Sequence, residues 1–226
     1  MYKKLEKKIG LKFKDHHLLK NAFIHRSYLN EHKSSKMESN ERLEFLGDAV
    51  LELVVTEYLY KTYPNPEGEL TNWRSALVKG DTLAIIAQEL DLGEHLFLSH
   101  GEENSGGREK DYLLANTFEA VIGVIYLELG YEKAKKFIEK FLLVRLEDIL
   151  KDGAHIDAKS KFQEMAQEKT GFTPAYELVH DEGPDHDKVF VMGAYIEDKI
   201  VGKGKGSSKQ SAEQEAAEDA LKRLKW

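Results

Sequence analysis

The stretch Asn40-Glu41-Arg42-Leu43-Glu44-Phe45-Leu46-Gly47-Asp48-Ala49-Val50 places three carboxylates at offsets of zero, three and seven in a segment with helical apolar spacing. Residues three, four and seven apart share one face of a helix, so Glu41, Glu44 and Asp48 are expected side by side. Like charges this close repel each other unless a cation neutralises them, and Mg²⁺ prefers carboxylate oxygen. Gly47 lowers helix stability by roughly 1 kcal/mol relative to alanine, which indicates that another group approaches the backbone closely. From spacing alone, a metal site and a solvated acidic face both remain open.

Helical apolar spacing continues through most of the first part of the chain. Apolar side chains recur every three or four positions within 43–54, 83–90 and 121–127. Polar breaks separate these segments at 30–40, 63–69, 93 and 100–107. The polar, glycine-rich stretch 99–109 is expected to be a mobile loop. We therefore predict an all-α domain over residues 1–150.

The acidic stretch also has a counterpart in a known family. Asn40 to Asp48 resembles the long and specific motif of ribonuclease III endonuclease domains. Three further segments, 18–28, 67–78 and 113–123, resemble other parts of the same domain. The likeness covers nearly the whole chain and implies an all-α endonuclease domain over residues 1–150.

A different pattern begins after residues 151–156, which we interpret as a linker in which Gly153 ends the preceding helix. Residues 157–226 predict a small α+β domain with the order α-β-β-β-α. Its helices are expected at 158–168 and 211–224, and its strands at 176–180, at 189–196 and from 199 onward. This order resembles the double-stranded RNA-binding domain, with local matches at 161–164, 183–188 and 204–214.

The second domain offers three contact points for duplex RNA, which is recognised by shape because its bases lie in a deep, narrow groove. The first helix would reach sugar hydroxyls, a loop would enter a minor groove, and the start of the last helix would hold phosphates. The expected contacts are Gln163, Glu164, His186, Lys205, Ser208 and Lys209. Alone, residues 202–206 are typical of a flexible, solvated loop, but their place before an alanine-rich helix favours phosphate binding. The family usually has a second basic residue where this chain has Gln210, which predicts weaker phosphate contact.

Composition narrows the class of protein. The hydrophobic content of 41% is sufficient for a core, and the absence of cysteine excludes disulfides and thiolate metal sites. No apolar run of signal-peptide length follows the basic N-terminus, and none approaches the ~20 residues of a membrane span. We expect a cytoplasmic protein with no membrane partner. The net charge of −7 argues against a general polyanion binder, although a local basic patch suffices for phosphate contacts.

Acidic residues in two predicted helices could hold catalytic metal ions. Phosphodiester hydrolysis needs an activated water and charge neutralisation at the leaving oxygen, which two divalent ions about 4 Å apart can supply. The resemblance implies the metal ligands Glu44, Asp48, Asn116 and Glu119, of which Asp48 and Glu119 are the catalytic positions most sensitive to change. It also implies supporting roles for Glu41 and Glu67, with Mg²⁺ as the cofactor and Mn²⁺ able to substitute. Without the resemblance, Asn116 and Glu119 could be an ordinary pair on a helix surface.

Asn116 departs from the family, which most often has aspartate at this position. Asparagine can still ligate a cation through its carbonyl oxygen, although it brings no charge. Three explanations are open: natural variation with activity retained, an engineered inactive form that traps RNA, or a lineage with weakened catalysis. We favour the first, because the neutral ligand still fits the geometry.

The resemblance further implies a homodimer in which each endonuclease domain cuts one strand and leaves short 3′ overhangs. Phe45 would insert into a pocket on the partner subunit. The alternative is that Phe45 belongs to the core.

Together these features predict an endoribonuclease that hydrolyses double-stranded RNA with divalent-metal-activated water, in ribosomal and messenger RNA processing. The alternative of another class is a cleavage-impaired double-stranded RNA-binding protein whose nuclease fold is only a dimerisation scaffold. Asn116 supports that alternative, and the retained acidic positions oppose it. A third hypothesis, a metal-dependent phosphohydrolase of small nucleotides, leaves the second domain unexplained.

Overall fold

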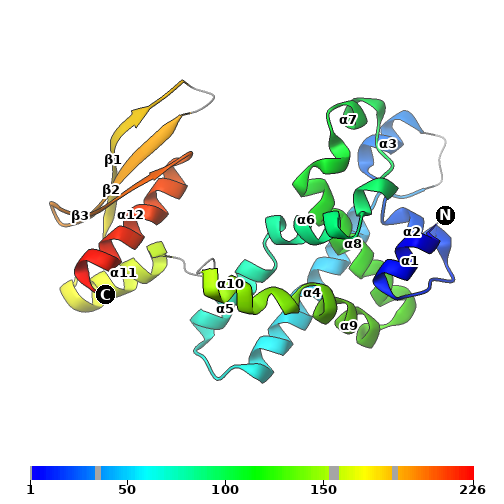
Figure 1. The fold of residues 1–226 in the computed structure, drawn as a ribbon, viewed down its shortest axis with the longest axis horizontal. Coiled ribbons are helices and arrows are strands. Elements are labelled where there is room, and N and C mark those ends of the chain that lie inside the picture. Colours follow the sequence, from blue (N-terminus) through cyan, green and yellow to red (C-terminus); the bar gives the residue numbers. More distant parts are fainter. Residues whose placement is uncertain (1, 34–36, 153–157, 185–187) are drawn as a thin grey trace. The chain divides into compact units, whose positions relative to one another are not determined.

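The computed structural model describes residues 2–33, 37–152, 158–184 and 188–226. The chain divides into two compact units, Met1–His155 and Ile156–Trp226, each with its own core (Figure 1). The predicted linker, 151–156, overlaps the end of a helix that runs to Asp152, and its remaining residues, including Gly153, lie outside the described residues.

Unit 1 is helical in the residues that the structure describes. Its α-helices are α1 (Lys3–Ile9), α2 (His16–Asn21), α3 (Arg26–Glu31), α4 (Glu41–Thr62), α5 (Glu67–Leu77), α6 (Gly80–Glu89), α7 (His100–Asn104), α8 (Asp111–Leu129), α9 (Tyr131–Phe141) and α10 (Leu146–Asp152). Short 3₁₀ turns are η1 (Leu92–His95), η2 (Gly107–Glu109) and η3 (Leu143–Arg145). This confirms the predicted all-α class of the first domain.

Helix α8 lies in the middle of unit 1, among α4, α6 and α9 (Figure 1). Its apolar residues occupy almost every face, and Phe118, Val121 and Ile125 have no exposed surface. A helix that is apolar all round is stable in water only when neighbours cover it. By length and composition α8 could also cross a membrane, which the sequence analysis did not anticipate, and 61% of the relevant window is buried inside the unit. It is therefore the core helix of this unit.

Asn40 fixes the start of α4. Its side chain is buried, its backbone N–H donates to the carbonyl of Ile24 at 2.8 Å, and its Nδ2 donates to the carbonyl of Ala22 at 3.4 Å. Its own carbonyl accepts the N–H of Glu44 at 2.8 Å. Because buried polar groups are costly unless they are paired, these bonds tie the acidic helix to the segment before it.

The stretch 99–109 is not the structureless loop that its composition predicted. It forms α7 and η2, which charged side chains hold in place. Arg108 Nη1 donates to the carbonyl of Gly93 at 2.8 Å, Arg108 also binds Glu103, and Lys110 Nζ donates to Glu102 at 2.6 Å. Helix α5 likewise starts at Glu67, inside the predicted break at 63–69. At 99–109 the paired charges and the Ser99 cap of α7 outweigh the polar composition, whereas α5 starts without a side-chain cap and has a hydrogen bond from Asn65 to Glu69 in its first turn.

Unit 2 has the predicted α-β-β-β-α order. It consists of α11 (Ala158–Thr170), β1 (Ala175–Glu182), β2 (Val189–Ile196), β3 (Lys199–Gly206) and α12 (Lys209–Leu224). The three strands form one antiparallel sheet in the order β1-β2-β3, with Ala194 paired to Tyr176 on one side and to Gly202 on the other. Phe162 and Ala166 of α11 and alanines of α12 pack with Ala194 to form the core.

Residues 202–206 belong to strand β3 and not to a loop, so the alternative of a flexible, solvated loop is excluded. The glycines alternate along the strand and face α12, where a Cβ on Gly202 or Gly204 would lie 2.3 and 2.2 Å from backbone atoms of Ala216. The lysines between them are exposed, and their backbone N–H groups point to the sheet edge. There Lys203 donates to Asp219 at 2.8 Å and Lys205 to Glu215 at 2.5 Å, both carboxylates coming from α12.

Candidate active site

Helices α4 and α8 touch through their backbones. A Cβ placed on Gly47 would lie 1.8 Å from the carbonyl oxygen of Glu119, and one on Gly123 would lie 2.3 Å from that of Leu43. Only glycine permits such an approach, since real Cβ atoms do not come closer than about 3 Å to other heavy atoms. The predicted use of Gly47 is confirmed, and the approaching group is the backbone of α8.

This contact brings four of the predicted ligands together. Glu44 and Asp48 flank Gly47 on α4, and Asn116 and Glu119 lie on α8, one turn apart. The side-chain amide of Asn116 favours the ionised form of Glu44 and so lowers its pKa, and the charges of Asp48 and Glu44 both act on Glu119. Asp48 is exposed, whereas the other three side chains are half-buried. The described residues thus form an acidic cluster that opens to solvent.

Burial and mutual repulsion change the acidity of this cluster. Burial, followed by the charges of Asp48 and Glu44, raises the pKa of Glu119 from its ordinary value of 4.5 to about 7. The pKa of Glu44 is also raised, by burial first and then by Glu41 and Asp48, against the hydrogen bond from Asn116. A carboxylic acid such as Glu119, whose pKa is about 7, indicates a place prepared for positive charge.

The raised pKa of Glu119 predicts a pH-dependent stability in metal-free protein. The folded state holds this proton up to about pH 7 and the unfolded chain only to about 4.5, so the stabilisation is complete below pH 4.5 and is lost as pH rises through 7. The shift corresponds to about 3 kcal/mol, which solvent access to the carboxylate reduces to on the order of 1–2 kcal/mol. In urea unfolding with EDTA, we expect the free energy of unfolding of wild type to fall by this amount, relative to that of Glu119→Gln, between pH 5 and 8. Parallel pH curves for the two proteins would contradict the assignment.

The two supporting acids are placed differently. Glu41 is exposed at the start of α4, where it accepts a hydrogen bond from Ser39 Oγ at 2.9 Å and faces Arg26 at 3.6 Å, and its charge reaches Glu44. Glu67 lies at the start of α5 and accepts a hydrogen bond from Thr71 Oγ1 at 3.1 Å. In the described part of the chain no contact joins Glu67 to the four clustered residues.

The donor set of the cluster suits a hard divalent cation. Three carboxylates and one amide carbonyl are the oxygen ligands that Mg²⁺ and Mn²⁺ accept. Among the described residues, no three His, Asp or Glu side chains are yet close enough together to hold an ion. The fit therefore rests on the chemistry of the donors and on the suppressed ionisation of Glu119. Glu44, Asp48, Asn116 and Glu119 are the residues that would hold the cation.

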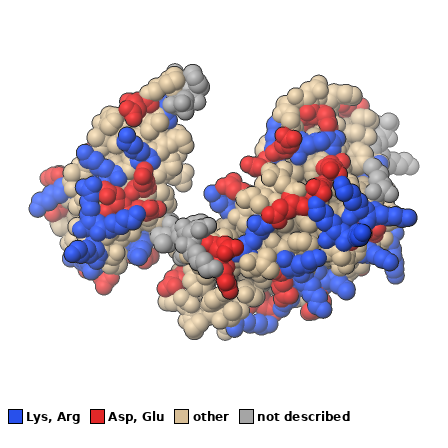
Figure 2. Space-filling model, in the orientation of Figure 1, with Lys and Arg blue, Asp and Glu red and all other residues tan. Residues whose placement is uncertain are grey.

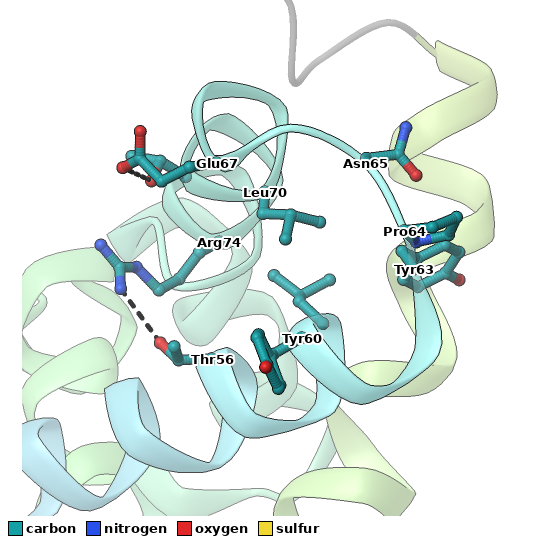
Figure 3. Close-up of a pocket in the computed structure, with 10 residues that line it drawn as sticks. Thr56, Tyr60, Tyr63, Pro64, Asn65, Glu67, Leu70 and Arg74 are labelled. Atoms are coloured by element: carbon teal, nitrogen blue, oxygen red, sulfur yellow. Dashed lines mark hydrogen bonds between the residues drawn. The ribbon is translucent and has the colours of Figure 1, made fainter.

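A pocket of about 630 Å³ lies between the end of α4 and the start of α5 (Figure 3). Tyr60, Tyr63 and Leu70 line it, and Glu67 and Arg74 belong to the same rim. Arg74 joins the two helices through Thr56 at 3.0 Å and Glu52 at 3.0 Å. No spacing in the sequence pointed to this pocket, and of the exposed apolar residues Phe45, Leu53 and Tyr60 on one face of α4, only Tyr60 lines it.

Phe45 is not a core residue. Its side chain is 79% exposed, beside the buried Gly47 and between the two clustered acids of α4. Leu53 and Tyr60 continue the same face and are 57% and 80% exposed. The alternative that Phe45 belongs to the core is therefore excluded, and α4 carries an uncovered apolar stripe.

Unit 2 presents most of the predicted RNA contacts on its surface. Gln163 and Glu164 are exposed on α11, and Lys209 is exposed at the start of α12. Lys205 lies on β3, before the start of α12 at Lys209. Its Nζ is 3.7 Å from a carboxylate oxygen of Glu182. Ser208 is the N-cap of α12 and exchanges hydrogen bonds with Ser211 in a capping box. His186 lies outside the described residues.

The capping box leaves part of the helix start free. The N–H groups of Ser208 and Ser211 are taken by the two hydroxyls. The N–H groups of Lys209 and Gln210 find no partner in the described ranges, as expected for the first turn of a helix. Ser208 therefore orders the helix start and leaves two N–H groups available to an anion, and the lysine beside it adds positive charge.

Comparison with known proteins agrees with both units. A family model described as ribonuclease-III-like matches residues 15–146, and one described as double-stranded RNA binding motif matches residues 158–224. Ribonuclease 3 of Enterococcus faecalis is 45% identical over 221 residues, which cover 97% of this chain and 96% of that protein. Ribonuclease 3 of Nitratiruptor sp. is 47% identical over 221 residues, covering 97% of this chain and 95% of that protein.

A solved structure agrees with unit 1. The nuclease domain of ribonuclease III from Campylobacter jejuni superimposes with a TM-score of 0.58 at 45% identity, covering 62% of this chain and 95% of that chain. Its description concerns flexibility in a region involved in dimer formation. The fold and the acidic cluster, joined to an RNA-binding unit, define an endoribonuclease specific for double-stranded RNA. The chain belongs to the ribonuclease III family.

Proposed function

We propose that this protein hydrolyses phosphodiester bonds of double-stranded RNA with the help of Mg²⁺, for which Mn²⁺ can substitute. One observation carries the proposal: the glycine contact between α4 and α8 gathers Glu44, Asp48, Asn116 and Glu119 into a cluster in which the pKa of Glu119 is about 7. When bound, a divalent cation neutralises charge on the scissile phosphate and on the leaving 3′ oxygen, and it activates the attacking water.

The residues of the chain prepare this step. Helix α4, anchored by Asn40, fixes Glu44 and Asp48, and the amide of Asn116 favours the ionised form of Glu44. The amide group of Asn116 carries an acceptor oxygen as well as its N–H donors, so that oxygen can serve as a neutral ligand. Glu119 must lose its proton before it can act as an anionic ligand, so cation binding should release a proton near neutral pH.

The cleavage test uses a long RNA duplex, with wild type in Mg²⁺, wild type in EDTA and Asn116→Asp in Mg²⁺. We expect wild type to cut in Mg²⁺ and not in EDTA, and Asn116→Asp to cut at a rate within about tenfold of wild type, because either residue supplies an oxygen ligand. Binding without cutting by wild type, with cutting restored in Asn116→Asp, would establish the cleavage-impaired alternative instead. That alternative is not favoured, since relatives named ribonuclease 3 match across 97% of the chain.

The exposed stripe of α4 supports a homodimer. Phe45 and Tyr60 are fifteen residues apart, about 22 Å along a helix, and the pocket lies at the Tyr60 end. In a two-fold contact the same patch meets itself, so two antiparallel α4 helices would bring Phe45 of one copy to the pocket of the other. Glu67, on the pocket rim, would then approach the acidic cluster of the second copy. The description of the Campylobacter jejuni nuclease domain names a region involved in dimer formation, which supports a dimer.

Phe45→Ala should weaken the dimer. Removing an aromatic side chain that fills a pocket should raise the dimer dissociation constant at least about 30-fold, or roughly 2 kcal/mol. Sedimentation velocity across a concentration series would measure the change. Leu127→Ala, which shortens a residue that is 53% exposed on α8, is the matched control and should leave the dimer intact. Equal dissociation constants for wild type and Phe45→Ala would exclude this interface.

We further propose that two such sites cut opposite strands and leave short 3′ overhangs, and that the substrates are ribosomal RNA precursors and structured messages. The location we propose is the cytoplasm, in line with a sequence of 226 residues that contains no cysteine.

A further inference from the structure

Two neighbouring segments of unit 1 concentrate positive charge in an otherwise acidic chain. Residues 3–14 and α9 together hold ten lysines against three glutamates, whereas the whole chain has a net charge of −7. Figure 2 shows Lys and Arg side chains gathered over the part of unit 1 that contains α1 and α9. The two segments come close together at Gly10, where an added Cβ atom would lie 3.9 Å from Lys140 Nζ of α9.

Most of these lysines are free of acidic partners. Lys4 and Lys8 pair with Asp91, and Lys135 pairs with Glu57. The others, which we call the lysine surface, have no ion pair among the described residues: Lys3, Lys7, Lys12, Lys14, Lys133, Lys136 and Lys140. Elsewhere in unit 1, Lys61, Lys79 and Lys110 each pair with a carboxylate. Lys20 and Lys33 are also without an ion pair in the described part of unit 1, so unpaired lysines are concentrated on this surface but not confined to it.

The lysine surface is separate from the acidic cluster. The N–H groups of Lys14 and Asp15 donate to Glu128, at the C-terminal end of α8, the second at 3.2 Å. Glu119 is nine residues earlier on the same helix, about 14 Å along its axis. A phosphate held by these lysines is consequently not the one at the cleavage site.

We propose that the lysine surface binds phosphates of double-stranded RNA outside the segment that is cleaved. Ammonium groups on flexible stems suit a contact that does not depend on sequence, because they bind phosphates as point charges. RNA is the favoured polyanion since unit 2 already brings it to the same chain at a high effective concentration. The proposal rests on RNA binding and not on cleavage.

A lipid surface fits less well. Helices that lie on membranes insert an apolar face between lipids. The apolar residues of α1 and α9 are instead buried in the core of unit 1, with Leu5 and Ile9 of α1 at 1% and 3% exposure and Phe137 and Ile138 of α9 at 3% and 0%. Neither helix has an apolar side left for a bilayer.

The test measures binding of long and short RNA duplexes to the full chain in EDTA over a range of salt concentrations. The variant Lys7→Gln/Lys136→Gln/Lys140→Gln removes three charges from the lysine surface. Its control, Lys79→Gln/Lys199→Gln/Lys222→Gln, removes three exposed lysines elsewhere. For the long duplex we expect the surface variant to bind at least about tenfold more weakly, with a salt slope lower by about 2 to 3. The control should match wild type.

Three results would overturn the proposal. The first is equal salt slopes for the surface variant and its control. The second is an equal loss for both duplex lengths, which would place these lysines in the main RNA site. The third is unchanged RNA binding combined with lost binding of polyglutamate, which would assign the surface to an acidic protein. Because no metal is present, failure of cleavage cannot produce any of these results.

Discussion

Glu119→Gln is expected to abolish cleavage of a long RNA duplex in Mg²⁺ while leaving duplex binding intact. The substitution keeps the size of the side chain and one oxygen, but it removes the negative charge of the ligand. The pKa of about 7 shows that burial and the neighbouring carboxylates oppose ionisation of Glu119 when no cation is bound. Loss of a charged ligand to the catalytic cation should lower the cleavage rate at least about 10³-fold, or roughly 4 kcal/mol of barrier.

Asp111→Asn is the matched control on the same helix. Asp111 is exposed in the first turn of α8 and accepts a hydrogen bond from Gln88 at 3.2 Å, away from the cluster. Cleavage by this control should stay within a few-fold of wild type. Single-turnover rates with saturating enzyme separate chemistry from binding. A Glu119→Gln protein that cuts at a tenth of the wild-type rate or faster would remove Glu119 from the catalytic ligands.

Gly47→Ala should have the largest effect on stability. The new Cβ would lie 1.8 Å from the carbonyl oxygen of Glu119, and backbone cannot move aside as the end of a flexible side chain can. Helices α4 and α8 would have to separate, which should cost about 3 kcal/mol or more. The same movement would shift Glu119 away from Asp48, so cleavage should fall together with stability.

Gly68→Ala provides the comparison. Gly68 lies in α5, and a Cβ there meets nothing within 4 Å. Alanine should therefore leave stability unchanged or raise it by up to about 1 kcal/mol through helix propensity. Urea unfolding of both variants, with equal m-values, would measure the difference. Similar midpoints for Gly47→Ala and Gly68→Ala would mean that the α4–α8 contact is looser than the structure indicates.

The acidic face of α4 was predictable because it depends only on the spacing of residues within one helix. The offsets of Glu41, Glu44 and Asp48 place them on one helix face whatever the rest of the chain does, and Gly47 among them indicated a close backbone approach. The partner helix and the exact neighbour, Glu119, required the resemblance to a family, since no spacing rule connects residue 48 to residue 119. Glu67 could not be placed by either route, because within one chain it lines a pocket and does not join the cluster.

The structure differs from expectation where the composition of a segment was considered without its tertiary contacts. Taken alone, the glycines of 202–206 were typical of a loop, yet their alternation with lysine is the period of a strand, and the tight packing of α12 requires glycine on the inner face. The polar stretch 99–109 suggested mobility, yet its arginine and lysine find carboxylates within reach. Phe45 left both a core and an interface position open, and its exposure excludes the core.

The carboxylates that α12 extends to β3 have a consequence for proteins crowded along one RNA molecule. A sheet edge with unpaired N–H groups is a template on which strands of other chains can assemble into aggregates. Asp219 and Glu215 saturate two of those groups on β3, at Lys203 and Lys205. At these two positions β3 therefore offers no free N–H group to a strand of a neighbouring copy, even where copies lie close together on a long duplex.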